Sequence, residues 1–146
     1  MSKDILVDNS IAKNFCNPLD PHYKRFIEWL FTEGELVVTQ RLIVEYHGST
    51  AASASATNIV AIIGKLLSDG RLRKVTKQEL TTFRISNRVA KKLRSNENDW
   101  DYVKAVMLSV RKFALSLDNN FVTDVNTFPG YTARAEYRPQ DLPYDS

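Results

Sequence analysis

Residues 5–10 read Ile-Leu-Val-Asp-Asn-Ser (ILVDNS), a short apolar run that ends abruptly in polar side chains. Such a run predicts a buried strand that carries polar groups at its C-terminal end. Leu36–Thr39 is a second short β-branched run, and Phe113–Leu117 is a third that ends at Asp118. Short, continuously apolar strands are typical of a parallel sheet that is covered on both faces.

Helical patterns separate these strands. In Tyr23–Phe31 the apolar residues recur at three- and four-residue spacing, and the pattern stops near Gly34. Thr132–Glu136 adds a predicted edge strand near the C-terminus. The alternation predicts a three-layer α/β/α sandwich with a mostly parallel central sheet. The other predicted helices cover Leu42–Tyr46, Ile59–Leu67, Gln78–Leu93 (one or two helices) and Val103–Val110.

The composition is that of one globular domain. The chain has 146 residues, of which 43% are hydrophobic and 25% charged, and these values are usual for a single soluble domain. Gly48–Thr57 is rich in small residues, and we interpret it as a site of close helix packing rather than as a linker. We therefore expect a single domain over residues 1–146.

The sequence also excludes several classes of protein. Cys16 is the single cysteine and His22 and His47 are the two histidines, so neither an internal disulfide nor a zinc finger is expected. No export signal and no run of about eighteen apolar residues is present. We expect a cytoplasmic protein that has no membrane association.

Acidic residues gather where the predicted strands end. The carboxyl ends of parallel strands meet at one edge of a sheet, where ligands bind in open α/β folds, and Asp8 and Asp118 fall there. Carboxylates held close together repel each other unless a cation compensates them. Mg²⁺ and Mn²⁺ favour oxygen ligands, and these ions promote phosphodiester hydrolysis.

Four segments together resemble the PIN domains, a family that includes the VapC-like toxin ribonucleases encoded with antitoxins. The resemblance covers nearly the whole chain, and the order and spacing of the segments carry it. Ser116 stands where the family has Thr in a Thr-x-Asp motif, and Asn120 stands where many members have another acid. The segments are Ile5–Ser10 (ILVDNS), Leu36–Glu45 (LVVTQRLIVE), Asp101–Ala105 (DYVKA) and Ala114–Phe121 (ALSLDNNF).

The resemblance implies a site for Mg²⁺ or Mn²⁺ and an RNA substrate. It also implies an antitoxin partner and a homodimer. Ser10 and Ser116 would be polar groups beside the acids, and Asn120 leaves open whether one or two metals bind. Asp99 competes with Asp101 for the third acidic position, and Asp101 is preferred because Ala105 then falls at the family's usual offset. The implied acidic quartet consists of Asp8, Glu45, Asp101 and Asp118.

Each acid also has an ordinary structural interpretation. Asp8 and Asp118 suit turns or helix caps, and Glu45 suits an ion pair with Arg41 one helical turn earlier. Asp101 suits the first turn of a helix that is capped by Asn98. These alternatives remain open at the level of sequence.

The net charge is +3, and basic residues concentrate between Arg71 and Arg94, where Glu79 is the one acid. Such segregation suits a phosphate-binding surface, although a charged helical face is often merely solvated. We expect Arg84, Arg88 and either Lys91 or Lys92 to share one helical face. The candidate RNA contacts are Arg84, Arg88, Lys91 and Lys92.

The sequence thus predicts an endoribonuclease that depends on Mg²⁺ or Mn²⁺ and cuts single-stranded or loop RNA. The alternative is a PIN-like module that has lost catalysis and binds nucleic acid or a protein. A haloacid-dehalogenase phosphatase is set aside because Ser10 stands where it needs a second Asp. A receiver domain is set aside because it needs an acidic pair near the end of the first strand, and Asp4 and Asp8 do not supply that grouping.

Overall fold

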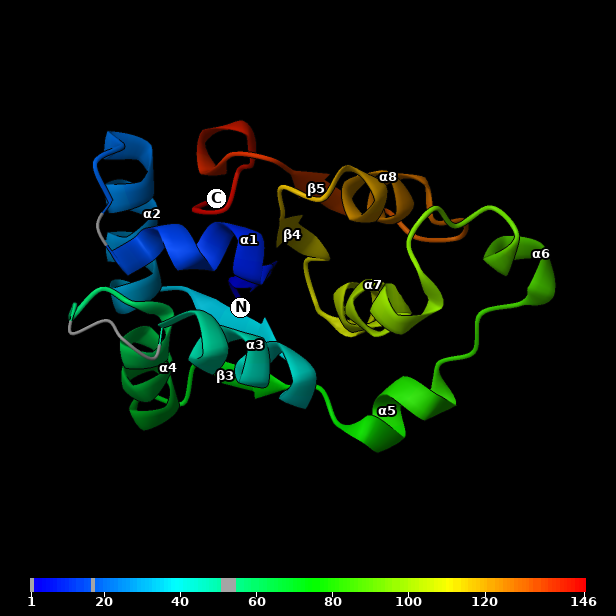
Figure 1. Ribbon diagram of the computed structural model, residues 1–146, viewed down its shortest axis with the longest axis horizontal. Coiled ribbons are helices and arrows are strands. Elements are labelled where there is room, and N and C mark those ends of the chain that lie inside the picture. The colour runs from blue at the N-terminus through cyan, green and yellow to red at the C-terminus, as the bar shows by residue number, and fades with distance from the viewer. Residues whose placement is uncertain (1, 17, 51–54) are drawn as a thin grey trace.

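The computed structural model describes residues 2–16, 18–50 and 55–146 and contains alternating strands and helices (Figure 1). The strands are β1 (Asp4–Val7), β2 (Glu35–Val38), β3 (Leu72–Lys74), β4 (Phe113–Leu115) and β5 (Arg134–Glu136). The α-helices are α1 (Asn9–Ala12), α2 (Pro21–Thr32), α3 (Gln40–Thr50), α4 (Ile59–Ser68), α5 (Lys77–Thr82), α6 (Asn87–Ala90), α7 (Trp100–Leu108) and α8 (Asn119–Thr127). Short 3₁₀ turns are η1 (Lys13–Cys16), η2 (Glu97–Asp99) and η3 (Pro139–Asp141).

The five strands form one sheet in the order β3-β2-β1-β4-β5, and every neighbouring pair is parallel. Figure 1 places α1–α4 on one side of the sheet and α7 and α8 on the other. The predicted α/β sandwich with a parallel sheet is therefore confirmed, and β5 lies at an edge as expected. Residues 51–54 of the small-residue segment, which is predicted to be a site of close helix packing, lie outside the described residues.

One strand is missing from the sequence prediction. β3 reads Leu-Arg-Lys and has no buried apolar run, but its residues pair with Leu36, Val37 and Val38 of β2. Charged side chains on a short edge strand discourage pairing with other chains. The strand is stabilised by backbone pairing with β2, and its sequence has no hydrophobic pattern. The sequence therefore indicates only the beginning of the basic segment there.

The core lies on both faces of the sheet. Every residue of β1 is buried, and so are Leu36, Val37 and Val38 of β2. On α2, Asp20 caps the first turn and Pro21 occupies the first helical position, which suits a residue without an N–H. Gly70, at φ +72°, lets the chain turn after α4 and enter β3.

The part of the basic segment that follows β3 forms an arm, which extends beyond α7 and away from α1–α4 (Figure 1). It contains two short helices, and Ser86 caps the second of them with its hydroxyl. The expected helical face shared by Arg84, Arg88 and either Lys91 or Lys92 is therefore wrong, because Arg84 lies between α5 and α6. Within the described residues, no helix combines the length and apolar character needed to cross a bilayer.

Candidate active site

Acidic side chains line a cavity of about 180 Å³ at the carboxyl edge of the sheet. Asp8 follows β1, Glu45 lies on α3, Asp99 ends η2, and Asp118 caps α8. Four elements that are distant in sequence thus contribute one carboxylate each. Leu6, Tyr102 and Phe121 complete the lining of this cavity, which we call the acidic pocket.

The pocket lies where the topology of the sheet changes direction. From β1 the chain proceeds to β2 and β3 on one side, then crosses to β4 and β5 on the other. Ligands in open α/β sheets bind outside the strand ends at such a switch point, because the diverging loops leave a crevice there. Asp8 and Asp118 follow the two strands that flank it, as the sequence predicts.

Asp8 is held by three short hydrogen bonds. Its Oδ1 accepts from the backbone N–H of Asn9 at 2.9 Å, and its Oδ2 accepts from the hydroxyls of Ser10 at 2.8 Å and Ser116 at 2.7 Å. A carboxylate offers about four lone-pair sites, so roughly one remains for a further ligand. The helix-capping alternative for Asp8 is thus also realised, together with its position in the pocket.

Asp118, like Asp8, both caps a helix and lines the acidic pocket. Its Oδ1 accepts from the backbone N–H groups of Asn120 at 2.9 Å and Phe121 at 3.3 Å, which caps α8. Its Oδ2 accepts no hydrogen bond from the described part of the chain. The carboxylate is therefore fixed by one oxygen and leaves the other available. The side chain of Asn120 does not line the pocket.

Glu45 belongs to a small polar network that includes Tyr102 and Arg41. Tyr102 donates its hydroxyl to Glu45 Oε1 at 2.5 Å, and Arg41 Nε lies 3.7 Å from the same oxygen. Arg41 also lies over the Tyr102 ring, 5.3 Å from its centroid. Burial raises the pKa of Tyr102 well above its ordinary value, and the bond to Glu45 raises it further, so the phenol stays a donor.

The third acid in the pocket is Asp99 rather than Asp101. Asp99 Oδ1 accepts from Arg41 Nη2 at 3.2 Å, and Arg41 also donates to the carbonyl of Asn98. Asp101, which the family resemblance placed in the quartet, lines a separate groove. The predicted cap at Asn98 is also absent, because α7 begins after Asp99, whose side chain makes no capping bond.

Arg41 and Tyr102 were not anticipated as pocket residues. The i,i+4 spacing of Arg41 and Glu45 indicated their ion pair, but nothing in the sequence indicated that Arg41 also reaches Asp99 across a separation of 58 residues. Tyr102 follows Asp101 directly and shares the helix start with it. Only the rotation of α7 decides which of these neighbouring side chains faces Glu45.

The donor types in the pocket suit a hard divalent cation, since all four carboxylates offer oxygen and no sulfur or imidazole is present among its lining residues. Within residues 2–16, 18–50 and 55–146, however, no three His, Cys, Asp or Glu side chains are grouped closely enough to hold a metal ion. Arg41 already pairs with Glu45 and Asp99. A cation that used these two acids would have to compete with the guanidinium.

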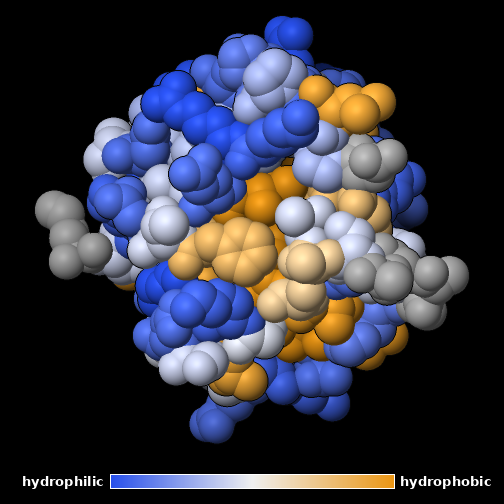
Figure 2. Space-filling view, turned by 90° about the vertical axis from the view of Figure 1, so that its left-hand side faces the viewer, coloured by the Kyte–Doolittle hydropathy of each residue, from blue (hydrophilic) through white to orange (hydrophobic). Residues whose placement is uncertain are grey.

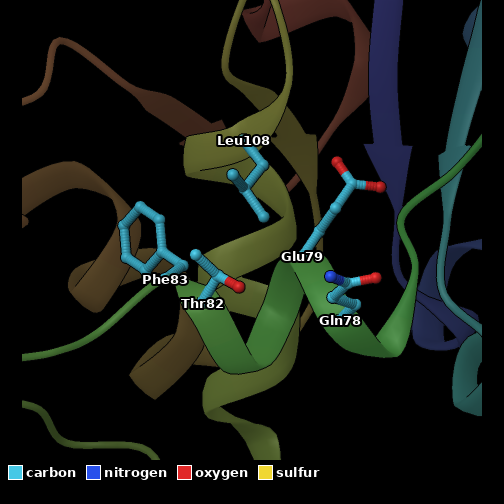
Figure 3. A pocket seen from close by; sticks show the side chains of 5 residues that line it. All are labelled: Gln78, Glu79, Thr82, Phe83 and Leu108. Carbon is cyan, nitrogen blue, oxygen red and sulfur yellow. The ribbon is translucent and has the colours of Figure 1, made fainter.

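A different cavity, of about 410 Å³, lies between α5 and α7. Figure 3 shows Thr82 of α5 and Phe83, which directly follows that helix, beside Leu108 of α7, with Gln78 and Glu79 at the other end. Glu79 is the single acid among its lining residues, and it pairs with Arg73 at 2.8 Å. This larger cavity therefore lacks the carboxylate grouping that marks the acidic pocket.

The four basic residues proposed from sequence are all exposed on the arm. Across the described chain, the side chains of Arg84, Arg88, Lys91 and Lys92 form no ion pair within 4.0 Å. Other cations of the basic segment are structural: Arg71 donates to the carbonyls of Leu30, Phe31 and Gly34. The arm thus carries cationic charge that the protein itself does not neutralise.

Comparisons with known proteins show the fold and no closer relationship. No family model and no curated protein matches the sequence. A solved structure, "Crystal structure of VapBC2 from Rickettsia felis bound to a DNA fragment from their promoter", is similar with a TM-score of 0.50 and 12% sequence identity. The similarity covers 91% of this chain and 97% of that chain. Taken with the five-stranded parallel sheet and its flanking helices, it shows that this chain has a PIN-like α/β fold.

Proposed function

We propose that this protein is a metal-dependent endoribonuclease that hydrolyses RNA phosphodiester bonds at the acidic pocket. The observation that carries the proposal is the meeting of Asp8, Glu45, Asp99 and Asp118 in one cavity at the switch point of the sheet. The similarity of the fold to a VapBC2 structure supports the same class of protein. Four acids in one crevice are costly unless a cation or a substrate-binding role compensates them.

Each acid has a distinct role in this proposal. Asp8, Asp99 and Asp118 would hold Mg²⁺ or Mn²⁺, and Glu45 would hold the ion or orient a water molecule. The ion supplies Lewis acidity toward a phosphoryl oxygen and an attacking water. Ser10 and Ser116 fix the carboxylate of Asp8 through Oδ2, so this ligand needs no reordering when the substrate arrives.

Tyr102 and Arg41 position the remaining carboxylates. The Tyr102 hydroxyl holds Glu45 Oε1, and Arg41 holds both Glu45 and Asp99. Because the guanidinium compensates two of the four acids, the pocket tolerates its own charge in the absence of a metal. Release of these acids by Arg41 is the rearrangement that metal binding would require.

Single-stranded or loop RNA is the substrate that suits this surface best. The deep groove of duplex RNA does not admit side chains, whereas unpaired bases are accessible. The cations of the arm, Arg84, Arg88, Lys91 and Lys92, are free to contact backbone phosphates. Such contacts would make RNA binding weaken steeply as salt rises.

A protein partner belongs to the same proposal. We propose that the chain acts as the toxin of a toxin–antitoxin pair and forms a homodimer. Figure 2 shows apolar residues gathered on the surface of the side on which α2 and α4 lie, and Leu67 of α4 is 66% exposed. Exposed apolar patches of this kind favour protein contacts. Cleavage that persists after saturation with a co-encoded protein would argue against an antitoxin.

The second candidate is a module that binds nucleic acid without cutting it. The observation that favours it is the spacing of the acids, since the described residues contain no group of three metal-ligating side chains. Asn120, which stands where many members of the family that the sequence resembles have another acid, points in the same direction. Metal dependence separates the two functions.

The deciding experiment is thermal melting of the wild type and of Asp8→Asn in Mg²⁺, Mn²⁺ or EDTA, followed by cleavage of a labelled single-stranded RNA. A ligand that binds only the folded state stabilises it by about 2.7 kcal/mol at one hundred times the dissociation constant. We expect a metal-dependent rise in the melting temperature of the wild type and little rise in Asp8→Asn. Asp141→Asn, at a surface carboxylate paired with Arg138, is the matched control and should keep both the rise and the cleavage. Absence of metal stabilisation and of cleavage in the wild type would support the binding module instead.

A further inference from the structure

A groove of about 600 Å³ lies beside the acidic pocket at the same edge of the sheet. It is built where β2 and β3 end and where α3, α5 and α7 begin. Arg41 connects the two sites, because it lines the groove and pairs with Glu45 and Asp99 of the acidic pocket. The groove is lined by Thr39, Gln40, Arg41, Lys74, Val75, Thr76, Lys77, Leu80 and Asp101.

The charge of the groove is predominantly positive, with three cations, Arg41, Lys74 and Lys77, against the single carboxylate of Asp101. Lys74 donates to the neutral amide oxygen of Gln40 at 2.7 Å, so its charge is not neutralised by that contact. Lys77 is exposed, and its ammonium group contacts no acid in the described part of the chain. Both lysines are therefore available to an anion.

The floor of the groove is apolar. Val75 is 1% exposed and Leu80 is 8% exposed, and both contribute to the lining. Ligand sites of roughly 300–1,000 Å³ usually combine such apolar walls with a few charged or polar groups. A phosphate at the lysines and a sugar or base over Val75 and Leu80 would match this division.

We propose that this groove binds the backbone of single-stranded RNA next to the bond that lies in the acidic pocket, with Lys74 and Lys77 as phosphate contacts. The inference rests on the proposed function for the identity of its ligand. The cations favour a polyanion, and the adjoining acidic pocket, the proposed place of phosphodiester cleavage, favours RNA over an acidic peptide. Arg41 sets the boundary between the nucleotide that is cut and its neighbour.

The groove and the arm would contribute differently to RNA binding. Arg88 lies on the four-residue helix α6, and Arg84, Lys91 and Lys92 lie just outside it. These exposed cations would attract RNA over a broad surface. Lys74 ends the edge strand β3, and Lys77 begins α5 three residues later, so both lie next to the sheet. Contacts on rigid elements fix register, and the groove would therefore determine which phosphodiester reaches the acids.

The test uses binding without cleavage. In an Asp8→Asn background, fluorescence anisotropy would measure the affinity of a labelled single-stranded RNA for Lys74→Gln/Lys77→Gln. The matched control is Lys3→Gln/Lys112→Gln, which removes the same charge where β1 and β4 begin, at the opposite edge of the sheet. Circular dichroism melts would establish that both double variants remain folded.

We expect the groove variant to bind at least tenfold more weakly than the parent and the control to change by less than about twofold. The slope of log K against log salt should fall by about 1.4, since each phosphate contact on a single strand contributes roughly 0.7. Equal losses in the two variants, or absence of RNA binding in the parent, would overturn the inference. So would tighter binding of a glutamate-rich peptide than of RNA at the groove.

The same variants separate this inference from the proposed function. Metal-dependent cleavage by the wild type, combined with equal losses in the two lysine variants, would leave the nuclease intact and remove the groove from it. Selective loss of RNA binding in the groove variant, without cleavage by the wild type under any metal condition, would keep the groove as an RNA-binding site and exclude the nuclease activity. In that case the groove serves the binding module.

Discussion

The hydroxyl of Ser116 donates a hydrogen bond of 2.7 Å to Asp8 Oδ2 and joins the ends of β4 and β1 at the acidic pocket. The same hydroxyl accepts the backbone N–H of Asp118 at 3.0 Å. Ser116 is fully buried, so no solvent can replace these contacts. One side chain therefore orients an acid on each side of the switch point.

Ser116→Ala should destabilise the fold and weaken metal binding together. Removing the hydroxyl takes one of the two hydroxyl donors away from Asp8 Oδ2, which keeps Ser10, and leaves the N–H of Asp118 without its partner. The cost should be about 1–3 kcal/mol in the free energy of unfolding. Urea denaturation with and without Mg²⁺ would measure both effects. Ser68→Ala, at an exposed serine on α4, should be nearly neutral, and an equally neutral Ser116→Ala would show that Asp8 is oriented without it.

Asp99→Asn should reduce metal stabilisation, whereas Asp101→Asn should not. Asp99 lines the acidic pocket, and Asp101 lines the groove on the other side of the helix start. Each variant removes one negative charge at nearly the same place in the sequence, so each is the control for the other. Melting temperatures in Mn²⁺ and EDTA would decide between them. The opposite ranking would return the ligand role to Asp101.

Asp124→Asn should loosen the C-terminal end of the basic arm. Asp124 is 1% exposed, and its two oxygens accept the backbone N–H groups of Arg94 and Ser95, each at 2.8 Å. An amide accepts through only one of its two terminal atoms, so one buried N–H loses its partner at a cost of about 2–3 kcal/mol. Hydrogen exchange should become faster in residues 84–95. Unchanged exchange there would mean that the arm is anchored by its apolar contacts alone.

Stability should fall in acid partly through Glu79. The hydrogen bond from Arg73, followed by the backbone bond from Thr76, lowers the pKa of Glu79 below its ordinary value of 4.5. A carboxylate whose pKa is lower in the folded state stabilises the fold above its unfolded pKa, and this contribution is lost as the pH falls through the folded pKa. Denaturant unfolding at pH 6 and pH 3 should show a smaller acid loss in Glu79→Gln than in the wild type. An identical loss in both proteins would assign the acid sensitivity to other carboxylates.

The sequence by itself determined the layers and most strand positions. Ile5–Val7, Leu36–Val38 and Phe113–Leu115 are apolar because both faces of a parallel sheet are buried, so each is recognisable in isolation. Asp8 and Asp118 were located for the same reason, since an acid that closely follows such a strand lies near the carboxyl edge. β3 was missed because a charged edge strand depends on its partner β2 and not on a pattern of its own.

Tertiary structure alone decided which acid near the start of α7 joins the others. Asp99 ends η2 and Asp101 lies in the first turn of α7, and their side chains line different cavities although they are two residues apart. The packing of α7 against β1 and β2 fixes its rotation, and that packing involves residues far away in the sequence. Arg41 is a second example. Its pairing with Glu45 is local in sequence, whereas its ion pair with Asp99 exists only in the folded chain. The boundary between the acidic pocket and the groove, which Arg41 forms, therefore depends on the tertiary structure.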